Sequence, residues 1–439
     1  MSQSYNAYSG PRGPLQHRCG LCETMRPDLL RCAGCRIVRY CSREHQIQDR
    51  SEHKELCKEI GGLRAGLERE DHIVRNATTD NGAPLNAFES LSGRFHISLP
   101  TREYIEARYA IAFQARRAGT LDGITEALEH FQDIVWLCRV YSLTTSNDVP
   151  ALLMRLGQDQ ECYDFIVWTA KSRDISYDSG NTDLPFLDIK DADVLGLDTL
   201  KTVISCFDNI DFLAIILLIK VKLLIDIRNL KVARKVLHGL PVDLCLEVER
   251  HAVQSPISLR LVGQSYGYLL STEVKLMKHC HLIKCKISEK YPEFMAELAD
   301  LRIETKVAWL WPRNNNPFGL MSKAMEGVYP AWWETPNALE LVRAAFHAVQ
   351  YRNFNVLHEY LGHQGTRLPS MPQEVHKRKR RDPAPYDPDT LEPYEFILIR
   401  IIKNSSYLGP KMDIETKKRK NKSKTEKKDK KRHKSGSTR

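Results

Sequence analysis

The spacing of apolar residues predicts helices through most of the chain beyond residue 100. In residues 121–141, apolar side chains recur at intervals of three and four: Ile124, Leu128, Phe131, Ile134, Val135 and Cys138. This is the period of a helix that buries one face. Similar patterns predict helices over residues 102–117, 149–156, 161–170, 271–287, 293–311 and 337–361. Strand patterns are sparse, so we predict a mainly α protein with an all-helical domain over residues 101–365.

Residues 200–237 form the most apolar part of the chain. They predict one or two fully buried helices around Asp208 and Asn209, and they contain the longest uninterrupted apolar run, residues 212–219. That run falls far short of the ~20 apolar residues that a membrane-spanning helix needs, so we expect no membrane span. Consecutive helices of this kind also suggest an α-solenoid, although we find no repeat of fixed period.

An acidic segment at residues 174–198 separates two of the predicted helices. It includes DSGNTDLPFLDIKDADVLG and is longer than most connections between helices. We interpret it as a solvated loop, with a packed or functional loop as the alternative.

The first 57 residues contain a cysteine and histidine pattern that predicts zinc binding. Two Cys-x-x-Cys pairs precede a Cys/His pair and a His/Cys pair with a spacing of four; the candidate ligands are Cys19, Cys22, Cys32, Cys35, Cys41, His45, His53 and Cys57. Each pair can supply half of a tetrahedral site, and residues four apart share one face of a helix. Eight ligands make two closed sites, which is typical of structural Zn²⁺ because no position is left for a substrate water.

Disulfides or free thiols are the alternative for these cysteines. The chain begins with the polar stretch MSQSYNAYSGPRG, which lacks the apolar core of a signal peptide. In a reducing compartment this cysteine spacing is used for metal, so we favour zinc. A finger of this size buries too little apolar surface to fold alone, and zinc binding should therefore supply its folding free energy.

These residues resemble a MYND finger, whose pattern is matched in order by CGLC, CAGC, RYCSREHQ and HKELC. The resemblance covers residues 19–57 and implies two interleaved zinc sites. The implied ligand sets are Cys19, Cys22, Cys41 and His45 for one ion, and Cys32, Cys35, His53 and Cys57 for the other. The resemblance also implies protein partners, among them proline-rich peptides.

Two positions depart from the family pattern. His45 stands where most members have cysteine, and neutral imidazole is a good zinc ligand, so we expect the site to persist with greater sensitivity to acid. Arg50 stands where many members have a tryptophan that helps to bind proline-rich peptides, while Gln46 near that surface is kept. The Asn-His-Ser-Cys segment of the SET-and-MYND lysine methyltransferases does not occur, so we do not expect that activity.

Part of the body resembles the helical region that accompanies MYND fingers in many fungal proteins. The similar segments are RLGQDQECYDFIVW and DLPFLDIKDADVLG. This second resemblance brings no established activity with it.

Positive charge is concentrated at the end of the chain. Residues 417–439 hold 13 Lys/Arg and 2 Asp/Glu, a net charge of +11 against +10 for all 439 residues, so the remainder is close to neutral. Together with KRKRR at 377–381, this tail predicts binding of a nuclear import factor and a location in the nucleus and/or cytoplasm. A merely solubilising tail is the alternative. The tail lacks aromatic residues for base stacking, so we do not expect specific nucleic-acid binding.

These patterns divide the chain into seven parts. We predict a disordered lead (1–16), the zinc finger (17–60), a linker (61–100), the helical domain (101–365), a Pro- and charge-rich linker (366–393), an apolar docking segment that includes YEFILIRII (394–404) and a disordered basic tail (405–439).

Four other motifs have mainly structural interpretations. Residues 263–267 (GQSYG) match the nucleophile elbow of α/β-hydrolases but lack its alternating α/β context, so we expect a connection between helices. HEYLGH at 358–363 has one residue too many for a zincin site. His279, Cys280, His281 and Cys285 offer one pair with metal spacing and no second pair. We expect Trp309, Trp311, Phe318, Trp332 and Trp333 to be packed aromatics in an irregular connection, with a peptide groove as the alternative.

We therefore predict a non-enzymatic, zinc-binding adaptor or regulatory scaffold. The alternative is an enzyme whose site lies in the helical body. A cavity in which the acidic residues Asp188, Asp191 and Asp193 face a histidine would favour the enzyme.

Overall fold

The computed structural model describes residues 12–77, 84–139, 147–173, 181–207, 209–237, 239, 241–299 and 317–350; for 317–325 and 346–350 it describes the backbone only. The predicted segments at 366–393, 394–404 and 405–439 lie outside these residues, as do HEYLGH, Trp309, Trp311, the side chain of Phe318 and most of the lead. The expectations about nuclear import and localisation depend on those segments, and they remain predictions.

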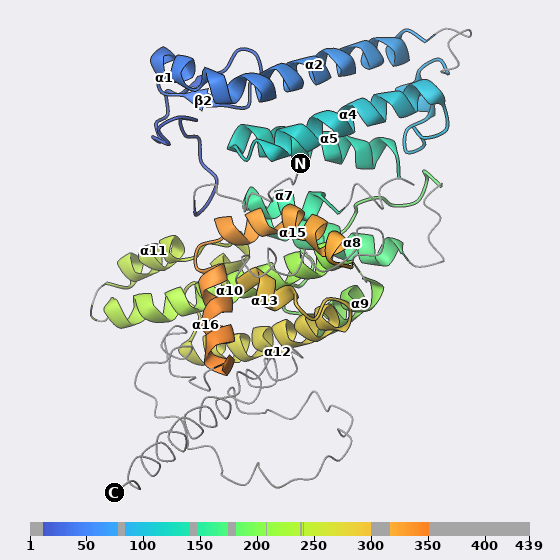
Figure 1. Cartoon of the computed structure of the whole chain (residues 1–439). Coiled ribbons are helices and arrows are strands. Elements are labelled where there is room, and N and C mark those ends of the chain that lie inside the picture. Colours follow the sequence, from blue (N-terminus) through green and yellow to red (C-terminus); the bar gives the residue numbers. More distant parts are fainter. Residues whose placement is uncertain are drawn as a thin grey trace, which may run out of the picture.

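The described elements form two layers (Figure 1). The upper layer contains strands β1 (Leu30–Arg31) and β2 (Arg39–Tyr40) and helices α1 (Arg43–Gln48), α2 (Arg50–Arg75), α3 (Ala87–Ser90), α4 (Leu99–Arg117) and α5 (Leu121–Leu137). The strands are antiparallel, with Leu30 opposite Tyr40. Helix α2 leaves the finger and packs along α4, which also packs against α5.

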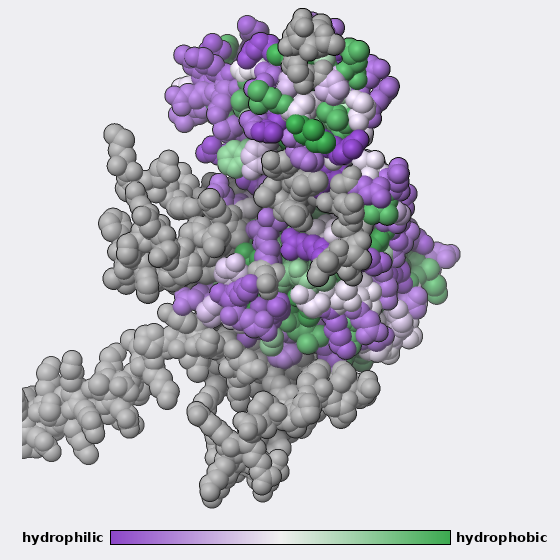
Figure 2. All heavy atoms as spheres, turned by 90° about the vertical axis from the view of Figure 1, so that its right-hand side faces the viewer, coloured by the Kyte–Doolittle hydropathy of each residue, from purple (hydrophilic) through white to green (hydrophobic). Residues whose placement is uncertain are grey.

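The lower layer is a bundle of helices. Its elements are α7 (Val149–Arg155), α8 (Asp159–Ser172), α9 (Leu197–Cys206), α10 (Ile210–Val236), α11 (Val242–Ala252), the 3-10 helix η2 (Pro256–Leu261), α12 (Tyr266–Lys290), α13 (Phe294–Ala299), α15 (Pro317–Glu334) and α16 (Ala338–Gln350). Helix α5 contacts α7 and so joins the layers. On the face shown in Figure 2, hydrophilic residues surround small groups of apolar ones in both layers.

Helix α10 lies at the centre of the lower layer, and every residue from Phe212 to Ile227 is buried. It contacts α7, α8, α11, α12, α15, α16 and η2. In a solenoid each helix pair contacts only its neighbours in sequence. The lower layer is therefore a bundle around one central helix.

Four charged side chains of α10 are buried in this core, and each binds a different part of the layer. Lys220 Nζ donates to the carbonyl of Val194, and Lys222 Nζ pairs with Asp159 at 2.9 Å. Asp226 accepts the N–H groups of Gln254 at 2.8 Å and Ser255 at 3.0 Å. Lys231 pairs with Glu273 at 2.8 Å. A buried charge costs several kcal/mol unless it is paired or hydrogen-bonded. Helix α10 thereby determines where α8, α12, residue 194 and the segment before η2 lie.

The helix predictions for the described residues are confirmed. The apolar stretch of residues 200–237 contributes to two helices, α9 and α10, and the Asn209 side chain caps α10 by accepting the N–H of Asp211 at 2.8 Å. The prediction of full burial holds for most of α10 and is wrong for α9, where only Leu200 and Val203 are buried. The described strands lie in the finger, as an all-helical body requires. The boundary between residues 60 and 61 falls inside α2, which continues through Gly61 and Gly62 to Arg75; no proline interrupts it. No described helix is long and apolar enough to cross a membrane.

The GQSYG segment is a connection between helices, as expected. Residues 256–261 before it form a 3-10 helix where a nucleophile elbow needs a strand. Gly263 has φ +73°, a conformation that suits glycine, and Ser265 caps α12 by accepting the N–H of Tyr268 at 3.1 Å.

The buried Lys231–Glu273 pair leads to a test of the α10 arrangement. Lys231→Met removes the ammonium group that pairs with the buried Glu273 carboxylate and should lower the free energy of unfolding by about 3–5 kcal/mol. The double variant Lys231→Met/Glu273→Leu should recover most of that loss, because both charges are removed. Urea unfolding followed by circular dichroism measures both.

Arg250→Met at the exposed Arg250–Glu247 pair is the control and should change stability by less than about 1 kcal/mol. A single variant as stable as the control would contradict this account.

Candidate metal centre

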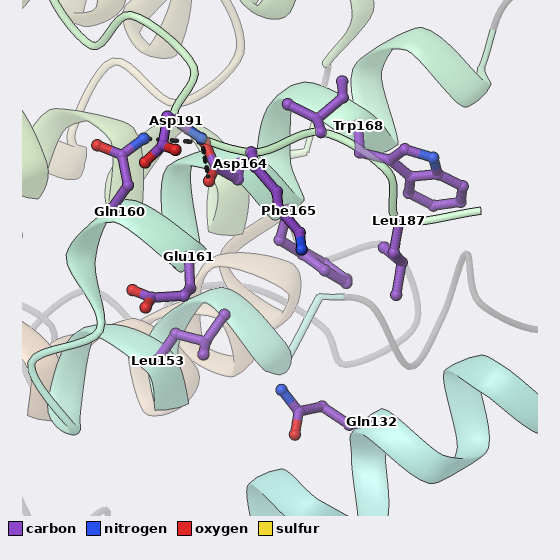
Figure 3. A pocket seen from close by; sticks show the side chains of 11 residues that line it. Gln132, Leu153, Gln160, Glu161, Asp164, Phe165, Trp168, Leu187 and Asp191 are labelled. Carbon is purple, nitrogen blue, oxygen red and sulfur yellow. Dashed lines mark hydrogen bonds between the residues drawn. The ribbon is translucent and has the colours of Figure 1, made fainter. Parts of the chain in front are cut away.

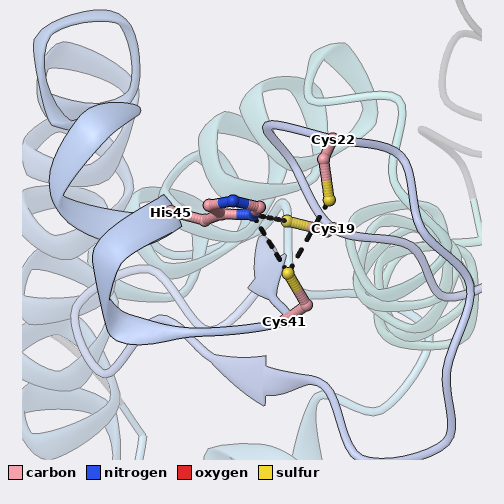
Figure 4. A group of neighbouring side chains, drawn as sticks. All are labelled: Cys19, Cys22, Cys41 and His45. Carbon is pink, nitrogen blue, oxygen red and sulfur yellow. Dashed lines mark hydrogen bonds between the residues drawn. The ribbon is translucent and has the colours of Figure 1, made fainter.

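The eight predicted ligands form two clusters in the finger. Cys19, Cys22, Cys41 and His45 make site 1, and Cys32, Cys35, His53 and Cys57 make site 2. Within each cluster all ligand atoms lie within 4.8 Å of one another. Figure 4 shows the three sulfurs of site 1 and the ring of His45 turned toward a common centre. This is the interleaved pairing that the MYND resemblance implies.

The distances within the clusters are close to the edges of zinc tetrahedra, except for a shorter Cys41–His45 edge in site 1. Zn–S bonds of about 2.3 Å and Zn–N bonds of about 2.0–2.1 Å give S···S edges of about 3.8 Å and S···N edges of about 3.5 Å. The S···S separations are 3.7 Å for Cys22–Cys41 and 3.7 Å for Cys32–Cys57. The S···N separations are 3.6 Å for Cys19–His45, 3.0 Å for Cys41–His45, 3.4 Å for Cys35–His53 and 3.4 Å for Cys32–His53.

The fold of the finger places these ligands through short local elements. Cys41 follows β2, and His45 lies on α1, where Ser42 caps the helix by accepting the N–H of His45 at 3.3 Å. His53 and Cys57 are one turn apart on α2. His45 presents Nδ1 to site 1, whereas His53 presents Nε2 to site 2.

Gly34, within the second Cys-x-x-Cys pair, is required by close packing at site 2. A Cβ atom at this position would lie 2.7 Å from Cys57 Sγ. Any larger residue would therefore push a ligand sulfur out of the tetrahedron.

The backbone of the finger favours the thiolate form at two of the cysteines. Burial acts to raise the pKa of Cys32, but the N–H groups of Cys35 and Gly34 and the His53 ring outweigh it and lower the pKa to about 6. Burial likewise opposes the N–H groups of Cys22 and Cys41 at Cys19, where the pKa falls to about 7. Thiolate is the form that binds zinc.

The charge of site 2 calls for a cation. Burial raises the pKa of Cys35 to about 12, and the negative charges of Cys32 and Cys57 add to this effect. A divalent ion at the centre would offset the repulsion among the three thiolates of the site. Donor types, most edge lengths and charge thus fit Zn²⁺ in both sites, with His45 in the ligand position that cysteine has in most of the family. Zinc held by four protein atoms cross-links the chain and offers no open position.

The finger is attached to the helical layers by Asp122, in the first turn of α5. Its carboxylate receives Arg39 Nε at 2.5 Å, Arg39 Nη2 at 3.0 Å and Arg31 Nη2 at 2.5 Å, so both finger strands are bound to one side chain. Burial acts to raise the pKa of Asp122, but Arg39 and then Arg31 outweigh it and lower the pKa below its ordinary value. The neighbouring Thr120 hydroxyl donates to the carbonyl of Ile37 at 2.6 Å.

A second attachment connects zinc site 2 to α5. Arg64 on α2 donates to the carbonyl of Cys35 at 2.5 Å and to both carboxylate oxygens of Glu126 at 2.6 Å. Sequence reasoning missed Asp122, Glu126 and Arg64, because a charged residue on a predicted helix face usually indicates solvent exposure. Asp122 lies 83 residues from Arg39 and 91 from Arg31 along the chain, and Glu126 lies 62 residues from Arg64. No spacing pattern in the sequence can reveal pairs so far apart.

The outer surface of the finger remains open. Four large apolar side chains are exposed there: Leu21, Met25, Leu30 and Ile47. Arg50, which replaces the family's tryptophan, is exposed as well, and Gln46 is half-buried.

The other candidates from the sequence are structural in the described part of the chain. His281 and Cys285 contact each other at 3.7 Å, yet the described residues around them form no further metal-binding group. His279 is buried, and burial lowers its pKa to about 3. Trp332 is buried in the core, and Trp333 packs under the guanidinium of Arg12 at 4.5 Å from the ring centre. Both lie on helix α15, so the expectation of an irregular connection is wrong for these two residues: the helix continues past Pro330.

The acidic segment borders a cavity, but the facing histidine that would favour an enzyme is not among its lining residues. A cavity of about 400 Å³ lies between α5, α8 and residues 187–191. Asp191 belongs to its lining, whereas Asp188 and Asp193 do not, and none of the lining residues is a histidine.

Comparison with known proteins agrees with the geometry of the finger. Residues 19–57 match the family described as the MYND finger. Egl nine homolog 1 of Homo sapiens is 40% identical over 73 residues, which are 15% of this chain and 17% of that protein. The chain thus spans less than a fifth of this relative. No solved structure matches significantly. The chain therefore contains a MYND-type zinc finger with two zinc sites, joined to a helical body.

The two-site assignment predicts zinc stoichiometry. Full-length protein should bind two zinc ions, and Cys35→Ser or His45→Ala should each reduce this toward one, as measured by mass spectrometry of bound metal. Zinc supplies on the order of 10 kcal/mol of folding free energy per site, so a chelator should unfold the finger. The lower layer should persist, because its core is separate from that of the finger. Cys206→Ser, outside both clusters, is the control and should retain two ions. A Cys35→Ser variant that still holds two would refute the assignment.

The attachment at Asp122 predicts that the finger can be released without loss of zinc. Asp122→Ala removes the acceptor of both strand arginines and should cost about 2 kcal/mol. Hydrogen exchange should then increase at β1, β2 and the start of α5, with two zinc ions still bound. Asp133→Ala, which removes a half-exposed carboxylate from the same helix, is the matched control and should have little effect. Equal exchange in the two variants would exclude Asp122 as the attachment point.

Proposed function

We propose that this protein is a non-enzymatic interaction adaptor or regulatory scaffold, in which the MYND finger binds protein partners and the helical body carries it. The observation that supports this most is that each zinc cluster is closed. Four protein atoms surround each centre, so the metal has a structural role and the finger's contribution is its surface.

The attachment of the finger supports a rigid binding surface. Asp122 and Arg64 fix the inner side of the finger on α5, while Leu21, Met25 and Ile47 remain exposed on the rest of it. A surface that is ordered before binding loses less conformational entropy when a partner docks.

Proline-rich peptides are the partner class that the MYND resemblance implies. A tryptophan would offer such a peptide a flat apolar platform, and Arg50 supplies a guanidinium instead. We therefore propose weaker binding of purely proline-rich peptides and a larger share of polar contacts in recognition by this finger.

The adaptor proposal predicts partners that depend on the finger surface. Affinity purification of full-length protein should recover proteins that are lost with Ile47→Glu, which places a charge on the exposed surface while leaving both zinc sites intact. The same proteins should be lost with Cys35→Ser. Val242→Glu, at an exposed apolar residue of α11, is the matched control and should retain them. Recovery of the same partner proteins by the wild type and by all three variants would contradict a binding role for the finger.

A further inference from the structure

The cavity between α5, α8 and residues 187–191 has one apolar side and one acidic side (Figure 3). It lies where the upper and lower layers meet, since Gln132 comes from α5 and most of the remaining lining from α8 and the acidic segment. Pockets between packed units are common binding sites. The function proposed above makes no use of it.

The apolar side is built from packed aromatic rings. Phe165 and Trp168 of α8 line the cavity together with Leu187 and Ile189. Trp168 packs edge-on against Phe186 with ring centres 4.7 Å apart, and Phe186 packs in the same way against Trp136 of α5 at 5.2 Å. Because each ring is held by the next, this wall is preformed for an aliphatic chain.

The acidic side carries carboxylates without a cationic partner. Glu161, Asp164 and Asp191 line the cavity against the single base Lys190, which leaves a net charge of −2. None of the three forms an ion pair within the described ranges. Glu161 and Asp191 are exposed to solvent and free to reorient toward a ligand.

Asp164 holds the acidic side in place. Its buried carboxylate accepts the N–H groups of Asp191 at 2.9 Å and Ala192 at 2.8 Å, and Gln160 Nε2 at 2.9 Å. These donors are neutral, so the negative charge of Asp164 is stabilised but not cancelled. Lys220 also binds the segment that carries Asp191, because its Nζ donates to the carbonyl of Val194. The segment that carries Asp191 is therefore fixed at two points.

An aliphatic stem with a cationic end matches both sides at once. Lysine and arginine side chains bury their methylene groups against apolar surface while the charged end stays near polar groups, and cations are attracted to aromatic faces. An anionic ligand would be repelled by the net charge, and a neutral ligand would leave the carboxylates unused. We propose that this cavity binds a lysine or arginine side chain presented by a partner protein. The cavity lies on the helical body, so this proposal does not depend on partner binding by the finger surface.

A synthetic peptide pool tests this proposal on the full-length protein. Each peptide carries one fixed lysine between randomised positions, and a second pool is identical except that the lysine is Nε-acetylated and neutral. Immobilised protein should retain members of the first pool and not the second, as measured by mass spectrometry. Glu161→Gln/Asp191→Asn should weaken retention about tenfold, because two charge-assisted contacts are lost. Asparagine is the suitable replacement at residue 191, where φ is +55°.

Asp183→Asn is the matched control. It makes the same change of charge in the same acidic segment, outside the cavity lining, and should leave retention unchanged. Equal retention of the two pools, or equal retention by wild type and the double variant, would overturn the proposal.

Carbodiimide cross-linking of the full chain tests whether this chain's own basic segments occupy the cavity. Cross-links from Glu161 or Asp191 to lysines beyond residue 376, with no retention of either pool, would assign the cavity to this chain's own basic segments and reject a partner.

Discussion

The need to pair every buried charge on α10 determines the arrangement of the lower layer. Lys220, Lys222, Asp226 and Lys231 project from a helix that is otherwise surrounded by apolar side chains. Each of them has its partner on a different segment, so each of these segments is favoured in the position where it can pair. Hydrophobic burial alone is not directional and would tolerate several packings. The pairing of Lys222 with Asp159 binds the start of α8, which carries one wall of the cavity, to α10.

The finger depends on a different interaction, the closure of two zinc tetrahedra. Its own core is small and separate from that of the body. Metal coordination therefore replaces the apolar burial that a larger domain would have. The attachment through Asp122 and Arg64 then gives this small module a fixed orientation on a large helical support.

Helix α5 connects the finger and the cavity. Asp122 and Glu126 near its start bind the finger, while Gln132 lines the cavity and Trp136 packs beside it. Two proposed binding surfaces thus share one helix. A partner that contacts both would be held by two sites at a fixed separation, which raises affinity without any new contact.

The sequence by itself determined the zinc ligands, their nature as closed sites and the positions of most described helices. Those features depend on residues that are close together in the chain, such as His53 and Cys57 on one turn of α2. Only the tertiary structure decided that Asp122 joins the finger to α5, that four charged residues of α10 are buried, and that Asp191 borders a cavity with Trp168. A lysine within an apolar run usually signals a solvent-exposed turn of helix. Here its burial depends on a partner up to 63 residues away, and spacing along the chain carries no information about such a pair.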